Sequence, residues 1–174
     1  MPKSSKEQIY SDEKKVIFEL QMNSNESIDT IAKNCGFSRQ KVWRIIKRLE
    51  KNKTIWGYHA VIDIEKLGIK HYLILAKKAM KPATKTADMI VTRKIEKEAK
   101  KIGVTIHGSH YLHGHYDWQI CFTAENLAKA KQFSEKLKTV YFPIIKDLEL
   151  LEIIFTVKEG CIENPEVKKL KKFL

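Results

Sequence analysis

The stretch that decides the fold is GFSRQKVWRIIKRLE, residues 36–50. Its apolar side chains recur at i, i+3, i+4 and i+7, a spacing that places them on one face of an α-helix: Val42, Ile45, Ile46 and Leu49. Ser38 precedes them and suits a helix N-cap, because its hydroxyl can accept a hydrogen bond from the first turn. Gly36 supplies the backbone freedom of a tight turn. The pattern therefore predicts a turn followed by an amphipathic helix that begins after Ser38.

The opposite face of this helix is basic. At about 100° per residue it is centred on four residues and bordered by three more: Gln40, Arg44, Lys47 and Lys51 in the centre, Lys41 and Arg48 at one border and Trp43 at the other. Residues 38–53 carry seven basic side chains against Glu50 alone, a net charge of +6, and hold three of the four arginines in the chain. Arg makes bidentate contacts with phosphate and guanine, whereas a merely soluble surface could use Lys throughout. This face therefore suits a nucleic acid.

Two more helices are expected before it. Ser11 is expected to cap the first, which ends near Asn23 and buries Val16, Ile17 and Leu20. Ser27 is expected to cap the second, which buries Ile28, Ile31 and Ala32. Three short helices, of which the last is basic and follows a glycine turn, predict a helix-turn-helix domain over residues 1–56, winged or not, whose final helix enters the major groove of DNA. The alternative is an ordinary three-helix unit with a solvated charged face.

The composition of the chain sets outer limits on its function. A length of 174 residues, with 43% hydrophobic and 31% charged residues, is typical of one or two small folded domains and excludes a large multidomain enzyme. No apolar run approaches the roughly 18 residues of a membrane span, and no signal peptide is recognised. Cys35, Cys121 and Cys161 have no CxxC spacing, so neither a disulfide framework nor a zinc site is predicted. We expect a cytoplasmic protein whose net charge of +12 favours DNA over a membrane as partner.

Beyond the helices the pattern changes to extended segments. Residues 57–68 alternate in polarity and are expected to form a linker strand, which must pair with another strand such as its copy in a second subunit. Residues 69–158 then alternate between strands and helices in the order βαββαβ: strands at 71–79, 104–112, 116–124 and 148–157, and helices at 86–101 and 126–141. This order predicts a ferredoxin-like α+β domain. Residues 159–174 are expected to form a tail with a short helix.

These residues resemble the Lrp/AsnC family, the leucine-responsive or feast/famine transcriptional regulators, over nearly the whole chain. Residues 36–50 are similar to the recognition-helix pattern of that family, and Ile55-Trp56-Gly57-Tyr58 with Asp63 and Leu67-Gly68 resembles its linker strand. Gly114-His115-Tyr116-Asp117 stands where the family has a Gly-x-x-Asp turn. Lys53 departs from the pattern, because the family usually has Gly there, so Asn52 or Lys53 must take the left-handed cap conformation.

The resemblance implies a homodimer built on the βαββαβ domains, with tetramers, octamers or larger rings formed from dimers. It also implies a small molecule, commonly an amino acid, bound where dimers meet. In this chain the effector residues would be Gly114, His115, Tyr116 and Asp117. Gly114 would let a ligand approach the backbone and Asp117 would accept from an ammonium group, although capping of the hairpin explains Asp117 equally well.

The expected mechanism is sequence-specific regulation of transcription. Ser38, Arg39 and Gln40 lie at the helix start that points into the groove. Gln40 is suited to reading adenine and Arg44 to reading guanine. The flanking residues would contact the DNA backbone or border it: Lys41, Trp43, Lys47, Arg48 and Lys51. A dimer would present two such helices to a pseudo-palindromic operator.

Two other functions stay open at this stage. An architectural protein would wrap DNA through the Lys-rich second half, residues 69–174, which carry a net charge of +8. An enzyme or metal protein would use the four histidines between positions 107 and 115: His107, His110, His113 and His115. The siroheme decarboxylases also pair an AsnC-like architecture with histidines in this region. However, a regular strand would place His107 and His110 on opposite faces, and no triad, P-loop or dinucleotide signature is present. We therefore predict no enzyme, no catalytic residue, no cofactor and no bound metal.

Overall fold

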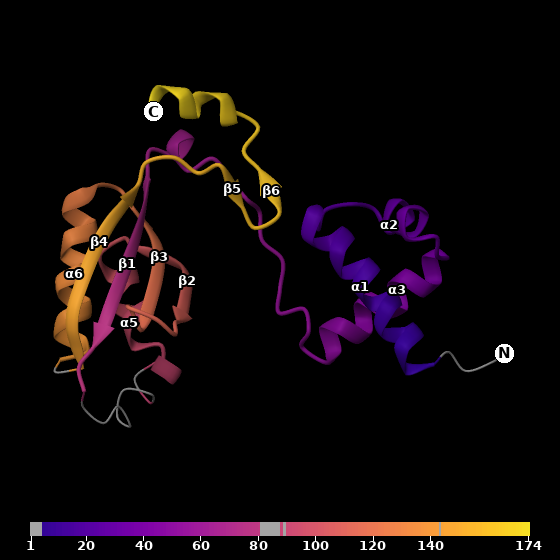
Figure 1. The fold of residues 1–174 in the computed structure, drawn as a ribbon, viewed down its shortest axis with the longest axis horizontal. Helices are drawn as coiled ribbons and strands as arrows, with labels where there is room; N and C mark the ends of the chain where they lie inside the picture. Colours follow the sequence, from indigo (N-terminus) through magenta and orange to yellow (C-terminus); the bar gives the residue numbers. More distant parts are fainter. Residues whose placement is uncertain (1–4, 81–87, 89, 143) are drawn as a thin grey trace. The chain divides into compact units, whose positions relative to one another are not determined.

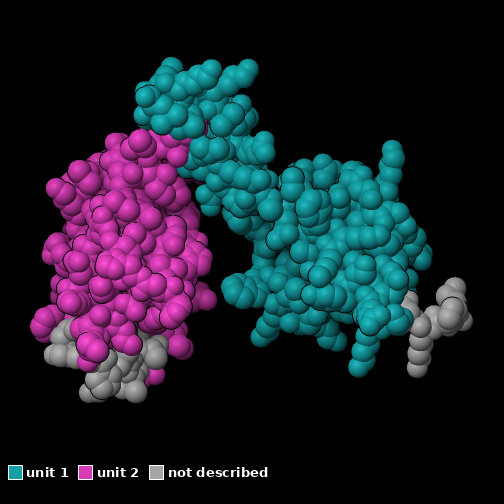
Figure 2. Space-filling model, viewed as in Figure 1, with its two compact units in different colours: residues 1–61, 156–174 teal, residues 62–155 magenta. Residues whose placement is uncertain are grey.

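The computed structural model describes residues 5–80, 88, 90–142 and 144–174. The chain forms two compact units, one of residues 1–61 together with 156–174 and one of residues 62–155 (Figure 2). Each unit has its own buried apolar cluster. In the described part of the chain, no helix combines the length and the hydropathy needed to cross a membrane.

The first unit begins with three helices, α1 (Lys6–Met22), α2 (Ile28–Cys35) and α3 (Arg39–Lys51) (Figure 1). Their core consists of side chains from all three helices: Val16, Ile31, Ala32, Cys35, Val42, Ile45 and Leu49. The predicted stripes of the three helices are thereby confirmed. Each helix is capped by a serine whose hydroxyl accepts a backbone hydrogen bond from the first turn: Ser5 from Gln8 N, Ser27 from Thr30 N and Ser38 from Lys41 N.

The predicted start of the first helix was wrong. Ser11 lies inside α1, which begins one and a half turns earlier at Lys6 and is capped by Ser5 at 3.1 Å from Gln8 N. The extra residues carry no apolar stripe, so the hydrophobic pattern gave no sign of them. As a result Asp12 is a mid-helix residue, 4% exposed, rather than a first-turn carboxylate that faces solvent.

Two backbone positions around α3 adopt the left-handed conformation. Gly36 ends α2 with φ of 69°, as the turn prediction requires. Lys53 follows α3 with φ of 61°, so it is Lys53 rather than Asn52 that takes the cap conformation. A non-glycine residue there costs roughly 1–2 kcal/mol. The backbone amides of Thr54 and Ile55 both donate to Leu49 O at 2.9 and 3.1 Å, which closes the end of the helix.

The expected linker strand does not form. Residues 52–69 contain only turns, irregular backbone and a single 3₁₀ turn, η1 (Glu65–Leu67). A strand exists through hydrogen bonds to a neighbouring strand, and no strand among the described residues pairs with this segment. Its apolar side chains are correspondingly exposed, with Trp56 at 94% and Ile62 at 56%.

In its described residues, the second unit has a four-stranded antiparallel sheet and the helices α5 and α6 (Figure 1). Its elements follow the predicted βαββαβ order: β1 (Lys70–Lys78), α5 (Lys94–Lys101), β2 (Thr105–Tyr111), β3 (Trp118–Ala124), α6 (Leu127–Val140) and β4 (Ile145–Ile153). The strand order is β2-β3-β1-β4 and all three pairings are antiparallel. The α+β, ferredoxin-like prediction is therefore confirmed.

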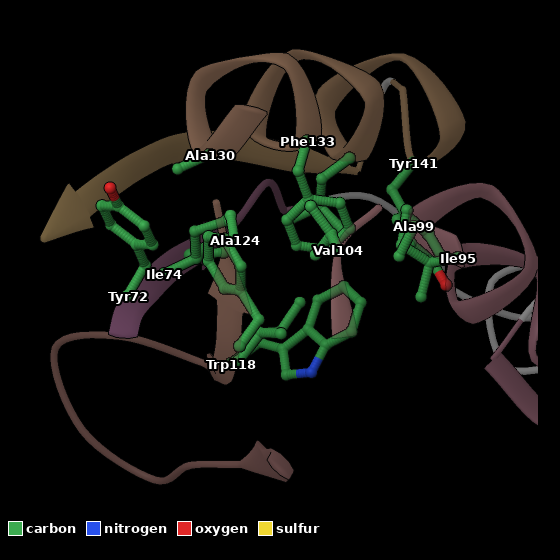
Figure 3. Close-up of a cluster of buried hydrophobic side chains, with 14 residues drawn as sticks. Tyr72, Ile74, Ile95, Ala99, Val104, Trp118, Ala124, Ala130, Phe133 and Tyr141 are labelled. Atoms are coloured by element: carbon green, nitrogen blue, oxygen red, sulfur yellow. The ribbon is translucent and has the colours of Figure 1, made fainter. Parts of the chain in front are cut away.

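One face of the sheet meets both helices in a single core. Alternate residues of the two central strands point into it, with Tyr72 paired to Phe122 and Ile74 to Ile120. Helix α6 contributes Ala130, Phe133 and Leu137 from above (Figure 3). Strand β3 and helix α6, both predicted from the sequence, thus pack against each other in this core.

The helix expected at 86–101 is interrupted. Arg93 has φ of 51° and precedes α5, which begins only at Lys94. The break turns Val91 outward, 80% exposed, while Ile95 and Ala99 enter the core. Residues 86, 87 and 89 of the expected helix lie outside the described residues.

The end of the chain differs from expectation in detail. Strand β4 ends at Ile153, short of the predicted Val157. A small hairpin follows, β5 (Lys158–Glu159) and β6 (Ile162–Glu163). The expected terminal helix is a 3₁₀ helix, η2 (Val167–Lys172), and it follows Asn164, whose side chain donates to Thr156 O at 2.7 Å and accepts from Glu166 N at 2.8 Å.

Candidate nucleic-acid interface

The solvent face of α3 presents the residues that the sequence places there. Gln40, Arg44, Lys47 and Lys51 are all exposed, and Trp43 is 51% exposed at one side of them. The opposite side of the helix holds Val42, Ile45 and Leu49 in the core. The three-helix unit therefore fixes the helix by its apolar stripe and leaves a polar, cationic strip free for a partner.

Two basic residues at the border of this strip bind helix α1. Lys41 Nζ lies 2.7 Å from Asp12 Oδ2, and Arg48 Nε lies 2.8 Å from Glu13 Oε1. The ammonium group of Lys41 also lies 3.8 Å from the centre of the Phe37 ring, a cation–π distance. These two side chains hold the flank of α3 against α1, a role that the sequence reasoning did not assign to them.

The remaining cations of α3 are lightly held. Arg39 Nη1 pairs with Asp29 Oδ2 at 3.2 Å, and Lys47 Nζ pairs with Glu50 Oε2 at 2.8 Å. Exposed pairs of this kind contribute about 0–1 kcal/mol, so phosphate oxygens can replace the carboxylates at small cost. In the described part of the chain no acidic side chain pairs with Arg44, whose Nε donates to Gln40 O at 3.3 Å, or with Lys51.

Asp12 is the buried member of the network. Gln8 Nε2 donates to its Oδ1 at 2.9 Å, while Lys41 binds Oδ2. Burial by itself would raise the pKa of Asp12, but the hydrogen bonds from Lys41 and Gln8 and the positive charges of Lys41 and Lys15 outweigh it, so the pKa lies below its usual value. Asp12 is therefore ionised at neutral pH and attracts the lysine of the recognition helix.

The residues expected to bind an effector lie around the β2–β3 turn. Gly114 and His115 are exposed in the turn, and the His115 ring packs edge-on against Tyr116 with centroids 4.9 Å apart. Asp117 is committed to the sheet, because its Oδ2 accepts from Lys78 N at 2.8 Å and its own N donates to Ala76 O at 3.0 Å. The Tyr116 hydroxyl donates to the Glu149 carboxylate. Asp117 thus closes the hairpin onto the end of β1, and Tyr116 links the turn to β4.

A shallow depression opens beside this turn. It is lined by residues of β1, β2, β3 and the α6–β4 connection, among them Lys78, Tyr111, Asp117, Trp118 and Tyr141. Tyr141 is buried beneath it and its hydroxyl has no hydrogen-bond partner within the described structure. Burial, together with the nearby charge of Glu96, raises the pKa of Tyr141 to about 12. The depression therefore combines aromatic walls, one carboxylate and two lysines, Lys77 and Lys78.

The four histidines do not form a metal centre in the described structure. A β-bulge lies between Ile106 and Gly108, so the regular alternation assumed for this strand is wrong at His107. His107 bonds Thr123 Oγ1 through Nε2 at 2.9 Å and lies 6.0 Å from the His71 ring, centroid to centroid. His110 pairs with Gln119 along the strand, so the bulge brings both histidines to the face of the sheet away from the helices. Across the described residues, no three His, Cys, Asp or Glu side chains gather as a metal would require.

The comparison with known families defines the class of the first unit. Residues 13–55 match the family of winged helix-turn-helix DNA-binding domains. This range includes α2, the Gly36 turn and α3. The first part of the chain is therefore a helix-turn-helix DNA-binding domain. No curated protein matches the chain at the level of its sequence.

Solved structures extend the comparison to the whole chain. An AsnC family transcriptional regulator from Agrobacterium tumefaciens has 16% identity and a TM-score of 0.61, over 89% of this chain and 96% of that one. A feast or famine regulatory protein from M. tuberculosis, complexed with L-methionine, has 15% identity and a TM-score of 0.68, over 89% and 98%. A transcriptional regulator from Neisseria meningitidis, in complex with L-Met, has 14% identity and a TM-score of 0.65, over 99% and 100%. The chain therefore has the fold of the Lrp/AsnC, or feast/famine, regulators.

Sequence reasoning missed the anionic partners of α3. Asp12 and Glu13 are adjacent in α1, and each binds a basic border residue of α3. Two consecutive acidic residues in the helix that crosses a basic recognition helix are a usable signal. A cap at Ser11 would place both carboxylates in the first turn, whereas the cap at Ser5 places them in the middle of α1, where they reach α3.

We expect Asp12→Asn to lower the free energy of unfolding by about 1–3 kcal/mol at neutral pH, because the variant loses a hydrogen bond between charged groups. The folded-state pKa of Asp12 is lowered, so its contribution is complete above the unfolded pKa of about 3.9 and is lost as the pH falls through the folded pKa. Urea unfolding of the wild type and the variant at about pH 7, 5 and 3 should show the difference shrink only at the lowest pH.

Asp29→Asn is the matched control. Its carboxylate pairs with Arg39 in an exposed position, with side chains 65% and 69% exposed, so its effect should stay below about 1 kcal/mol at every pH. Equal losses in the two variants would contradict the special role of Asp12.

Proposed function

We propose that this chain is a cytoplasmic, sequence-specific DNA-binding regulator of transcription, which acts as a homodimer or larger oligomer and responds to a small molecule such as an amino acid. The observation that carries the proposal is the exposed face of α3, where Gln40 and Arg44 stand beside one another with no acidic partner among the described side chains. The match of residues 13–55 to DNA-binding domains supports it.

The division of labour on α3 follows from its contacts. Gln40 and Arg44 lie one turn apart at the centre of the exposed face, the position from which a recognition helix reaches base edges. Arg39, Lys47 and Lys51 flank them and would hold phosphates, two of them after releasing an exposed carboxylate. Lys41 and Arg48 keep the helix in place through α1. Ser38, whose hydroxyl caps the helix, and Trp43 border the contact.

A second copy of the chain is proposed to cover the open face of the sheet. Both helices pack on the other face, so the described structure leaves this one to solvent. Its centre is apolar and half-buried, with Leu73 paired to Leu151 on β4 and to Cys121 on β3. An antiparallel sheet can leave one face in water when that face is polar, so an apolar strip at its centre is a candidate surface for a partner. Pairing two copies there would present two recognition helices to a pseudo-palindromic site.

An amino-acid effector is proposed for the depression beside the β2–β3 turn. Asp117 could receive an ammonium group, Lys78 a carboxylate, and Tyr111 and Trp118 an apolar side chain. The L-methionine complexes of the M. tuberculosis and N. meningitidis proteins support a ligand of this class. Since the same region lies at the end of the sheet, binding there could alter how dimers associate.

The base-reading role predicts that two α3 variants differ in how their losses of affinity depend on the DNA sequence. Arg44→Ala should weaken binding to the preferred duplex by about 1–3 kcal/mol and relax selection at one base position. Lys51→Ala should weaken preferred and random duplexes alike and reduce the salt dependence of binding. Selection from random DNA, followed by titration of both variants on a selected and a scrambled duplex, measures this. Equal losses on the two duplexes for Arg44→Ala would refute base reading, and a wild type that binds no duplex would refute the proposed function.

The proposed dimer predicts that Leu73→Glu yields a folded monomer, because a carboxylate at the centre of the apolar face would be buried without a partner. Sedimentation velocity measures whether the variant is a monomer or a dimer, and circular dichroism checks that it is folded. Gln132→Glu, on the exposed side of α6, is the control and should sediment as the wild type. A dimeric Leu73→Glu variant would place the interface elsewhere.

If the proposed effector site binds an amino acid, isothermal titration calorimetry of the protein should detect heat of binding for at least one common L-amino acid. Asp117→Asn should weaken this binding by about ten- to a hundredfold, since it removes a charge-assisted hydrogen bond worth ~1.5–3 kcal/mol. The asparagine oxygen can still accept from Lys78 N, so the hairpin should remain closed. Glu125→Gln, exposed before α6, is the control. Titrations without heat for all amino acids, or unchanged affinity in Asp117→Asn, would contradict the site.

A further inference from the structure

The 3₁₀ helix η2 sorts its side chains into three rows. Residues three apart eclipse one another in a 3₁₀ helix and lie about 6 Å apart along its axis. Over Val167–Lys172 and the following Phe173 this places the side chains in one apolar row and two basic rows: Val167, Leu170 and Phe173 in the first, Lys168 and Lys171 in the second, Lys169 and Lys172 in the third. Two of the three sides of the helix are therefore purely cationic.

The apolar row is only partly covered, and the lysines are exposed. Leu170 is half-buried, and Val167 and Phe173 are 41% and 47% exposed, whereas all four lysines are exposed. Lys169 pairs with Glu166. No acidic side chain pairs with Lys168, Lys171 or Lys172 within the described structure. The segment 167–174 has four lysines and no acidic residue, a net charge of +4.

Another lysine-rich helix, α5, differs from η2 in the acidic residues that it carries. Helix α5 (Lys94–Lys101) also carries four lysines, but Glu96 and Glu98 lie among them. Glu98 binds Lys101 at 2.7 Å and Lys136 at 3.0 Å, and these partners lower the pKa of Glu98 to about 2. The charge of α5 is thus partly neutralised within the protein, while that of η2 is available to a polyanion.

We propose that residues 167–174 form a second DNA contact, which binds the phosphate backbone of the duplex held by α3. This inference rests on the proposed function. Residues 156–174 group with residues 1–61, so the lysines belong to the same compact unit as the recognition helix (Figure 2). A lipid surface fits less well, because the apolar row is partly covered and an amphipathic membrane helix needs that row outward.

The segment would add affinity and not sequence preference. Lysine is a point charge that binds phosphate without reading bases. Once α3 holds a duplex, the segment meets the backbone at a high effective concentration, so even weak contacts contribute. Each phosphate that it neutralises releases counterions and adds about 0.9 to the slope of log affinity against log salt on B-DNA.

The test compares two triple variants of the full-length chain. In one, Lys168, Lys171 and Lys172 are changed to Gln; in the matched control, Lys94, Lys97 and Lys100 of α5 are changed to Gln, so that both lose three charges. Fluorescence anisotropy measures binding to a selected and a scrambled duplex over a range of salt. The η2 variant should lose about 2–3 from the salt slope, equally on both duplexes, and the α5 variant should retain the wild-type slope.

The possible results distinguish a failure of the second DNA contact from a failure of the proposed function. A wild type that prefers its selected duplex, combined with an η2 variant of unchanged slope, overturns the second contact and leaves the proposed function intact. Equal losses in the α5 and η2 variants overturn it also, since net charge alone would then explain the effect. Binding of phosphatidylserine vesicles that is lost in the η2 variant, with DNA binding unchanged, would assign the lysines to a membrane instead. A wild-type protein that binds no duplex would contradict the proposed function itself.

Discussion

The ion pair between Lys41 and Asp12 decides what α3 can offer to a partner. It joins the recognition helix to α1 at 2.7 Å, and Arg48 and Glu13 repeat the connection at 2.8 Å two turns further on. With the apolar stripe in the core on one side and two ion pairs on the next, the helix cannot rotate about its axis. Gln40 and Arg44 are left at the exposed centre of α3, which is the face that we propose reads DNA.

The second unit is organised by the alternation of its strands. Because side chains on β1 and β3 point to opposite faces in turn, the same strands fill the core under α5 and α6 and present Leu73 and Leu75 on the open face. Both helices cover one face of the sheet, and the apolar side chains at the centre of the other face form the surface proposed for a second copy. The proposed dimer surface and the proposed effector site therefore belong to one scaffold.

Local signals predicted most of this architecture. The caps at Ser27 and Ser38, the stripe of α3 and the βαββαβ order each depend on residues close together in sequence, and all agree with the structure. The predictions that were wrong concern features that depend on contacts between distant residues or on a single backbone angle. The bulge at His107 arises from pairing with β3, and the break at Arg93 comes from one left-handed residue that is not glycine. The linker at 57–68 has a strand pattern, but no strand pairs with it in the single chain.

In the candidate interface too, some features follow from residues close together in sequence and others depend on contacts between distant residues. The positions of Gln40, Arg44, Lys47 and Lys51 followed from helical periodicity alone. The division of the basic residues into those that hold the helix and those that remain available did not, because it depends on where α1 crosses α3. Likewise, Asp117 could be placed in a turn from the sequence, but its bond to Lys78 N requires the sheet register.

The separation on α3 between residues that hold the helix and residues proposed to read bases has an evolutionary consequence. Gln40 and Arg44 make no core contact and no ion pair among the described residues, so the operator preference that we propose they set can change by single substitutions while the fold is kept. Lys41 and Asp12 are constrained to change together, because replacing only one of them leaves the other charge without its ion-pair partner at the side of the helix. Paralogues of this chain could therefore diversify their targets rapidly while the pair that orients the helix stays fixed.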